Sequence, residues 1–152
     1  MEKEKMGVLI NNSQNRRRIS RAYIRETAQV ILNALDCPDG ELSILIVDDK
    51  EIAKLNKQYL HREGPTNVIA FPMRDVNFPG ISHDLLGDVV ISVETAERDG
   101  NNSDVGIKKR FTELLIHGIL HLFGYDHERN RYQANKMEKK AAELLKKVNS
   151  EW

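Results

Sequence analysis

Short apolar runs separated by polar stretches recur along the first part of the chain. The runs are rich in branched aliphatic residues and most are closed by Asn, Asp or Pro, a pattern typical of β-strands. They predict four strands, at 6–10, 42–47, 68–71 and 85–93. Because Pro72 has no N–H to donate to a sheet, the third strand should end there or lie at an edge.

Apolar residues at helical spacing fill much of the remaining sequence. They predict helices over 17–35, 48–59, 105–123 and 131–148, with a short helical piece at 94–98. Asp48 and Glu51 have the spacing of an N-cap and its box partner, and Asp104 stands where it can cap the helix over 105–123. Asp-Gly-Asn-Asn at 99–102 predicts the end of the short helical piece at 94–98. At the end of the chain, residues 146–152 are expected to fray.

The order of these elements predicts an α+β fold, in which a small mixed four-stranded sheet packs against about five helices. The helix over 105–123 is apolar on most of its sides, so it should be buried at the centre. Residues 73–84 carry turn formers and charges without periodicity and predict a long loop. With neither repeats nor linker composition, the 152 residues are expected to form a single domain over 1–152.

Composition places the chain among globular proteins, with 40% hydrophobic and 30% charged residues. No apolar run approaches the ~20 residues of a membrane helix, and the first residues do not have the pattern of a signal peptide. The single cysteine, Cys37, excludes an internal disulfide and fits a reducing compartment. We therefore expect a cytoplasmic protein without a membrane partner.

Net charge bears on nucleic-acid binding. The formal net charge is zero, which argues against a protein that holds nucleic acid by bulk charge. Two local basic clusters stand at 16–25 and at 108–110. Each is explained equally well as a solvated helix end and as a nucleic-acid contact, so the sequence alone favours neither.

The candidate chemistry lies in three histidines near the end of the central helix. His117 and His121 are four residues apart, so on a helix they lie on one face, one turn apart. Gly124 stands where a helix needs a left-handed residue to end, and the returning chain can bring His127 to the same point. Three imidazoles suit Zn²⁺ and leave one coordination position open for water. The histidines predict one zinc ion per chain. The nearby Asp126 is better placed to orient a ligand than to bind the metal itself.

The spacing H-x-x-x-H-x-x-G-x-x-H is that of the metzincin metallopeptidases, whose general base is a Glu directly after the first His. In this chain that position is Gly118. A peptidase of that type would lack its base. The residues therefore indicate a metal site of the hydrolytic type that belongs to a different family.

Residues 117–127, H-G-I-L-H-L-F-G-Y-D-H, resemble the signature of the YbeY family of bacterial zinc-dependent endoribonucleases. Blocks at 55–72 and 86–92 resemble the same family in order and spacing. The resemblance implies a single-strand-specific endoribonuclease that acts in rRNA maturation and ribosome quality control. It also implies ribosomal RNA and ribosomal subunits as partners, no DNA, and one antiparallel strand near the metal.

The chain departs from the family at one position. The residue after the aromatic that follows Leu55-Asn56 is usually an arginine credited with function, and here it is Leu60. Arg62, or else His61, can reach the same space, and we predict Arg62 as the cation beside a phosphoryl transition state. This departure leaves two alternatives open: a non-catalytic ribosome assembly factor with a structural zinc, and a metallopeptidase-like hydrolase.

One further acid attracts attention. Asp88 lies inside the apolar strand at 85–93, where a carboxylate is costly unless it is paired. We expect it either to orient a metal ligand or to cap the central helix. Thr66 can bind a phosphate or close a turn. The attacking group, a zinc-bound hydroxide or the 2′-OH of the RNA, is not fixed by the sequence.

Overall fold

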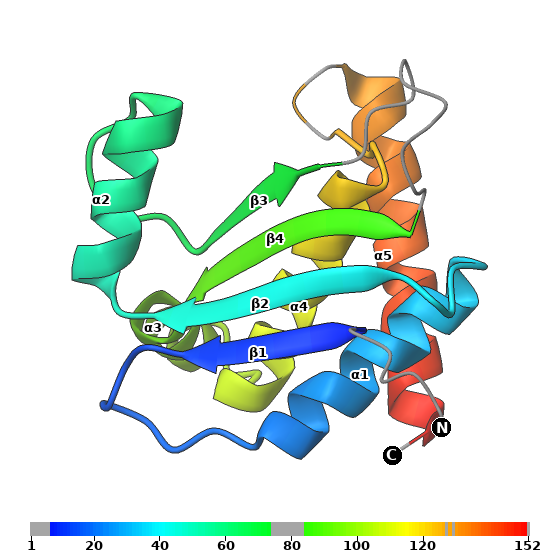
Figure 1. Cartoon of the computed structure of the whole chain (residues 1–152), viewed down its shortest axis with the longest axis horizontal. Helices are drawn as coiled ribbons and strands as arrows, with labels where there is room; N and C mark the ends of the chain where they lie inside the picture. Colours follow the sequence, from blue (N-terminus) through cyan, green and yellow to red (C-terminus); the bar gives the residue numbers. More distant parts are fainter. Residues whose placement is uncertain (1–6, 74–83, 127, 129, 152) are drawn as a thin grey trace, which may run out of the picture.

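The described part of the chain forms one sheet and five helices (Figure 1). A computed structural model describes residues 7–73, 84–126, 128 and 130–151. The elements in these residues are β1 (Val8–Asn12), α1 (Arg21–Ala34), β2 (Glu41–Val47), α2 (Asp49–Leu60), β3 (Val68–Pro72), β4 (Leu85–Ser92), α3 (Val93–Asn102), α4 (Ile107–Leu122) and α5 (Arg131–Glu151). The predicted α+β class is confirmed.

The sheet is mixed, with the strand order β1-β2-β4-β3. β1, β2 and β4 are parallel, and β3 runs antiparallel to β4 at one edge. This position confirms the expectation drawn from Pro72, the last residue of β3. β3 thus has one side that is not paired with another of the described strands.

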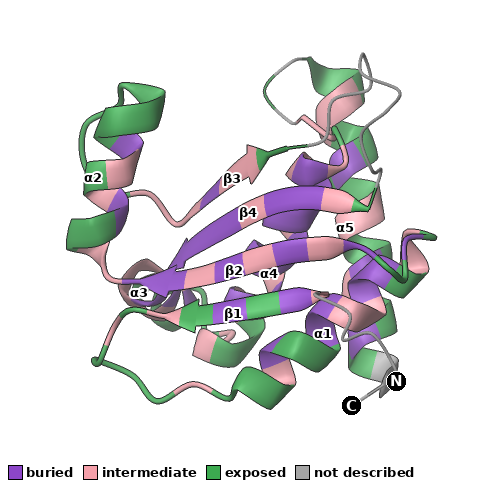
Figure 2. Cartoon of the chain, viewed as in Figure 1, coloured by how far each residue is buried: buried purple, intermediate pink, exposed green. Residues whose placement is uncertain are grey.

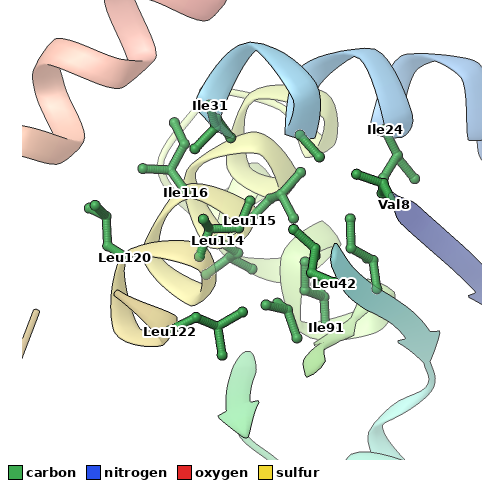
Figure 3. Packing of buried hydrophobic residues seen from close by; sticks show 14 of the residues in the cluster. Val8, Ile24, Ile31, Leu42, Ile91, Leu114, Leu115, Ile116, Leu120 and Leu122 are labelled. Atoms are coloured by element: carbon green, nitrogen blue, oxygen red, sulfur yellow. The ribbon is translucent and has the colours of Figure 1, made fainter. Parts of the chain in front are cut away.

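The two faces of the sheet are covered to different extents. α1, α4 and α5 pack on one face and enclose the larger core with residues from β1, β2 and β4 (Figure 3). On the other face a small cluster joins Ile52 of α2 to Val47, Ile69 and Val90 of the sheet. Side chains are buried along most of β4, whereas β1 alternates between buried and exposed positions (Figure 2). α4 therefore lies between the sheet and α5, buried as its apolar sequence predicted.

The turn between α3 and α4 differs from the prediction. α3 continues through the Asp-Gly-Asn-Asn segment to Asn102, because Gly100 packs against the next turn of chain. A Cβ at Gly100 would lie 2.6 Å from the carbonyl carbon of Gly106. Asp104 has φ 60° and does not cap α4; Gly106 precedes the helix, without a side-chain cap. The backbone N–H groups of Val105 and Gly106 donate instead to the Gly100 carbonyl, each at 3.1 Å.

A carboxylate at the start of α2 fixes this helix to α3. Asp48 caps α2 as predicted, and the next residue, Asp49, accepts hydrogen bonds from the hydroxyls of Ser92 and Thr95, both at 2.6 Å. Arg98 lies 2.7 Å from the other oxygen of Asp49. Burial alone would raise the pKa of Asp49, but these donors outweigh it and hold the pKa below its usual value. One end of α2 is thus anchored, and the other reaches the candidate site.

The chain ends in an ordered helix. Residues 146–152 were expected to fray, but α5 continues to Glu151 because Val148, only 1% exposed, is anchored in the main core. Trp152 and most of the predicted loop at 73–84 lie outside the described residues. Among the helices described, none is both long and apolar enough to span a membrane.

Candidate metal centre and cleft

A cleft of about 620 Å³ runs beside the open edge of β3. Its walls come from the end of α2, from 66–72, from one side of α4 and from the segment after α4. The residues with polar or aromatic side chains that line it are Arg62, Thr66, Asn67, Arg110, His117, His121, Tyr125, Asp126 and Glu128. Segments far apart in sequence therefore place a polar set of side chains around one hollow.

The structure brings two of the three predicted zinc ligands to this cleft. His117 and His121 both line it from α4. The Nδ1 atom of His117 lies 2.9 Å from the carbonyl oxygen of Glu113. A carbonyl only accepts, so a hydrogen bond here puts a proton on Nδ1 and leaves Nε2 as the ring atom available to a metal. A backbone carbonyl that fixes the tautomer in this way is the usual support of a metal-binding histidine, and the imidazoles fit the predicted ion.

The third predicted ligand, His127, lies outside the described residues. Within the residues that are described, no group of three His, Cys, Asp or Glu side chains is close enough to hold a metal ion. The flanking residues Asp126 and Glu128 both line the cleft, and the Asp126 carboxylate accepts a 2.9 Å hydrogen bond from the backbone N–H of Glu128. The predicted ligand therefore stands in sequence between two residues of the cleft.

The predicted turn at the end of α4 is confirmed. Gly124 has φ 94°, in the left-handed region, and its N–H donates to the carbonyl of His121 at 3.0 Å. The next N–H, of Tyr125, donates to the carbonyl of Leu120 at 3.1 Å. These bonds close the helix as a left-handed cap does. The chain then turns back, so that Tyr125 and Asp126 form one wall of the cleft.

Gly118 fills the position where a metzincin carries its base. A Cβ built on Gly118 would lie 2.5 Å from Cγ1 of Val89 and 3.2 Å from Cγ2 of Val68. The side of α4 that bears Gly118 is therefore in contact with the sheet. A glutamate at this position would meet β4 instead of the cleft. This contact counts against the metallopeptidase alternative on steric grounds.

Arg62 reaches the cleft from the end of α2. Leu60 is the last residue of the helix and is 41% exposed at the rim, and His61 follows in a left-handed conformation with φ 56°. The Nη2 atom of Arg62 lies 3.7 Å from a carboxylate oxygen of Glu128, and both side chains are exposed. Exposed pairs of this kind are weak, so the guanidinium can exchange this partner for a phosphate. His61 does not line the cleft.

Of two further residues that shape the site, sequence reasoning missed Asn56 and named Arg110 only as a member of the basic cluster at 108–110. Asn56 is 4% exposed, and its side-chain NH₂ donates to the Gly64 carbonyl at 2.9 Å. The backbone carbonyl of Asn56 accepts from the N–H of Arg62 at 3.3 Å. It thereby holds the loop that carries Arg62. Arg110 adds a second guanidinium to the cleft, 3.4 Å from Asp99 and 3.7 Å from Glu113. A polar residue on the apolar face of α2 was the available signal for Asn56.

The prediction for Asp88 is wrong. Successive side chains of a strand point to opposite faces, and Val89 faces α4 through its contact with Gly118. Asp88 therefore lies on the other face, where it lines a separate hollow with Asn11 and Ser43. There it neither orients a ligand in the cleft nor caps α4. The half-exposed carboxylate is solvated in that hollow, which avoids the cost of burial.

The backbone of β3 offers donors to the cleft. Two bonds fix which residues face β4: Ser92 N–H to the Asn67 carbonyl, and Met73 N–H to the Leu86 carbonyl. In an antiparallel pair such residues alternate with residues that face outward, so Val68 and Ala70 direct their N–H groups away from β4. Both residues line the cleft. Pro72, the next outward position, has no N–H, which leaves two outward donors along the strand.

The fold and cleft together define a small α+β protein with a histidine-bearing helix beneath an edge strand, an arrangement suited to a metal-assisted hydrolase. A family model described as Endoribonuclease YbeY matches residues 9–149. The chain therefore belongs to the YbeY family of endoribonucleases. The resemblance drawn from the three sequence blocks is confirmed, and with it the assignment to the nucleases.

Individual relatives agree with this assignment. An Endoribonuclease YbeY from Syntrophotalea carbinolica is 46% identical over 149 residues, which cover 97% of this chain and 99% of the relative. One from Geobacter metallireducens is 44% identical over 141 residues, covering 92% and 94%. The chain also superposes on the solution structure of a Thermotoga maritima protein with a TM-score of 0.66 and 24% sequence identity. The superposition covers 95% of this chain and 91% of the Thermotoga protein, and it supports the fold.

Proposed function

We propose that the chain is a zinc-dependent endoribonuclease that cuts single-stranded RNA in rRNA maturation and ribosome quality control. The observation that carries the proposal is the tautomer-fixed His117, which shares with His121 a cleft rimmed by arginine. One zinc ion per chain would be held by His117, His121 and His127. The proposed partners are ribosomal RNA and ribosomal subunits in the cytoplasm, without DNA or membrane.

The residues of the chain orient the reacting groups. The Glu113 carbonyl holds the His117 ring so that Nε2 is the metal-binding atom, and α4, packed on the sheet, keeps this ring and that of His121 in register. Bound at these rings, a zinc ion supplies a hydroxide nucleophile at neutral pH or polarises a phosphoryl oxygen.

A phosphodiester also needs groups that stabilise its negative charge. Arg62 at the rim supplies a guanidinium for the charge that develops in the transition state. The outward N–H groups of Val68 and Ala70 supply donors for non-bridging oxygens. Successive outward donors on a strand are ~6.8 Å apart, comparable to the spacing of phosphates in an extended single strand. The cleft thus offers donors to the backbone of an RNA strand rather than to its bases.

The two rival functions have less support. A structural zinc is normally closed by a fourth protein ligand, whereas the two helix histidines face an open hollow. A metallopeptidase needs a base after the first histidine, and Gly118 is packed against Val89 at that position. Catalysis on RNA is the function that accounts for the arginine, the outward donors and the histidines together.

Metal analysis and cleavage assays on the same preparations test the proposal. The purified protein should carry about one zinc ion and cut single-stranded RNA, and a chelator should abolish cleavage. His117→Ala should lose both the metal and the activity. Arg62→Ala should keep the metal and cut ~10²-fold more slowly, the cost of losing one donor to the transition state. Full cleavage by metal-free protein, or hydrolysis of peptides but not RNA, would overturn the proposal.

A matched control is available in the same loop. His61 is the neighbour of Arg62 but does not line the cleft, and asparagine tolerates its left-handed conformation. His61→Asn should therefore leave cleavage unchanged. Equal losses in His61→Asn and Arg62→Ala would show that the loop conformation matters, and not the guanidinium.

A further inference from the structure

A second hollow, of about 430 Å³, lies between the start of α1 and the start of α4. Arg17, Arg18 and Lys108 line it, and Ile24 and Phe111 contribute apolar surface. We call these five residues the basic groove. The cluster at 16–25 and the cluster at 108–110, separate in the sequence, meet here.

The charge of the basic groove is only partly neutralised by the protein. Arg17 lies 3.6 Å from the carboxylate of Glu97. In the part of the chain that the structure describes, Arg18, Lys108 and Lys109 form no ion pair, and all three side chains are exposed. A chain of zero net charge has therefore gathered unpaired cations on one surface. Such a surface complements a polyanion.

The groove holds one of these cations in place. The Nζ atom of Lys108 lies 4.5 Å from the ring centroid of Tyr23, a cation–π contact. The ring is fixed in turn by a 2.7 Å hydrogen bond between the Tyr23 hydroxyl and Oγ1 of Thr112. A positioned ammonium beside an apolar surface suits an unpaired nucleotide, whose phosphate takes the charge and whose base covers the apolar part.

The groove is within reach of the cleft along α4. Lys108 stands nine residues before His117, so the helix rises ~14 Å between them and also turns by ~180°, which places the two side chains on opposite sides of α4. Arg110, two residues after Lys108, already lines the cleft. The start of α4 therefore carries a cation of the cleft on one side and a cation of the groove on another. A strand bound at the histidines needs several more nucleotides to pass Arg110 and go round the helix to the groove.

We infer that the basic groove is a second RNA-binding surface, which holds the part of a single-stranded RNA that extends beyond the cleft. The inference rests on the proposed function, because it takes the strand in the cleft to be RNA. It predicts that affinity depends on RNA length: a strand that fills only the cleft gains nothing from the groove, and a longer strand gains phosphate contacts there.

The test compares two single-stranded RNAs, one of about four nucleotides and one of about fifteen. The groove variant combines Arg18→Glu with Lys108→Glu. The control variant combines Lys139→Glu with Lys146→Glu, at exposed positions of α5, and has the same change in net charge. Binding is measured by fluorescence anisotropy on chelator-treated protein, which leaves the RNA whole. Cleavage is measured on metal-loaded protein, and circular dichroism checks that each variant is folded.

The groove variant should bind the longer RNA at least ~10-fold more weakly, with a shallower salt dependence, while the short RNA and the metal content are unaffected. The control should match the wild type. Unchanged binding of the longer RNA, or an equal loss in the control, would overturn the inference. If the wild type cuts neither RNA, and the groove variant still loses binding of the longer RNA, the proposed function is refuted while the groove remains supported as an RNA-binding surface.

Discussion

Gly118 illustrates how the absence of a side chain can shape a site. Because a Cβ at this position would lie 2.5 Å from Val89, glycine is what allows α4 to approach β4 and β3 so closely. The approach sets the distance between the histidines on α4 and the edge strand. The glycine at position 118 therefore accounts both for the missing peptidase base and for the close packing of α4 on the sheet.

Gly118→Ala should destabilise the protein. In an unconstrained helix the exchange would add up to ~1 kcal/mol of stability, because glycine is a poor helix former. Here the added methyl overpacks the contact with Val89, and we expect a net loss of ~1–3 kcal/mol in the free energy of unfolding. Urea denaturation monitored by circular dichroism measures the change.

A double mutant tests the stated cause. Val89→Ala removes the methyl group nearest to the new Cβ, so Gly118→Ala should cost less in that background than in the wild type. A Gly118→Ala protein as stable as the wild type would show that α4 and the sheet can move apart at no cost.

At the residue level, sequence reasoning succeeded where one element sets the geometry. His117 and His121 share a face of one helix, and the structure places both at the cleft. Sequence reasoning failed for Asp88 because residues 85–92 are mostly apolar on both sides of the strand. Without an alternation of apolar and polar residues, the sequence does not show which side chains face α4. Asn56 was missed because its partners, the loop carbonyl of Gly64 and the N–H of Arg62, are fixed only by the fold.

Among the elements, β3 has a structural role and, in the proposed function, also a binding role. Its residues alternate between N–H groups bonded to β4 and N–H groups directed away from β4. Removing one N–H of each kind should therefore have opposite consequences. Proline makes that change with little alteration of size, and an edge strand tolerates proline at an outward position.

Ala70→Pro should impair RNA cleavage and leave the fold intact. The lost donor faces the cleft, and a charge-assisted hydrogen bond of ~1.5–3 kcal/mol corresponds to a ~10- to 100-fold fall in kcat/KM. Melting temperature and zinc content should not change. Ile69→Pro is the contrasting control, because its N–H is bonded to β4 and its loss should lower the melting temperature. Normal cleavage by a folded Ala70→Pro protein would exclude this donor from phosphate binding.

Boundaries between elements were the least predictable part of the sequence. Asp-Gly-Asn-Asn is rich in turn formers, yet it forms the last turns of α3. Gly100 is used there for close contact with Gly106 and not for conformational freedom. Such a role depends on a neighbour that the local pattern does not reveal. The Asp48 cap of α2, which depends only on the next three residues, was predicted correctly.

For the whole molecule, the hydrophobic pattern predicted the class, the number of strands and the central helix. It did not predict the strand order β1-β2-β4-β3, because pairing β2 with β4 joins residues 44 or 45 positions apart. The main core is built from apolar side chains of α1, α3, α4, α5 and the three parallel strands. Because burial of these side chains requires no ligand, the protein should fold without the proposed metal.

Removal of the metal should nevertheless lower stability. An ion bound only by the folded state adds its binding free energy to the free energy of unfolding. A chelator should reduce the melting temperature of the wild type by several degrees and leave the far-ultraviolet circular dichroism unchanged. His121→Ala should melt at the lower temperature with or without chelator. A chelator effect that persists in His121→Ala would place the bound metal elsewhere.

The open edge of β3 also affects how copies of the protein meet one another in a crowded cell. Unpaired strand edges are templates on which a second chain can add a strand, and this is a common route to aggregation. β3 is five residues long and ends in Pro72, so a neighbouring copy finds only two outward N–H groups, at Val68 and Ala70. Two donors are too few to nucleate an intermolecular sheet. The shortness of the strand should therefore protect its exposed edge against strand addition by a neighbouring copy.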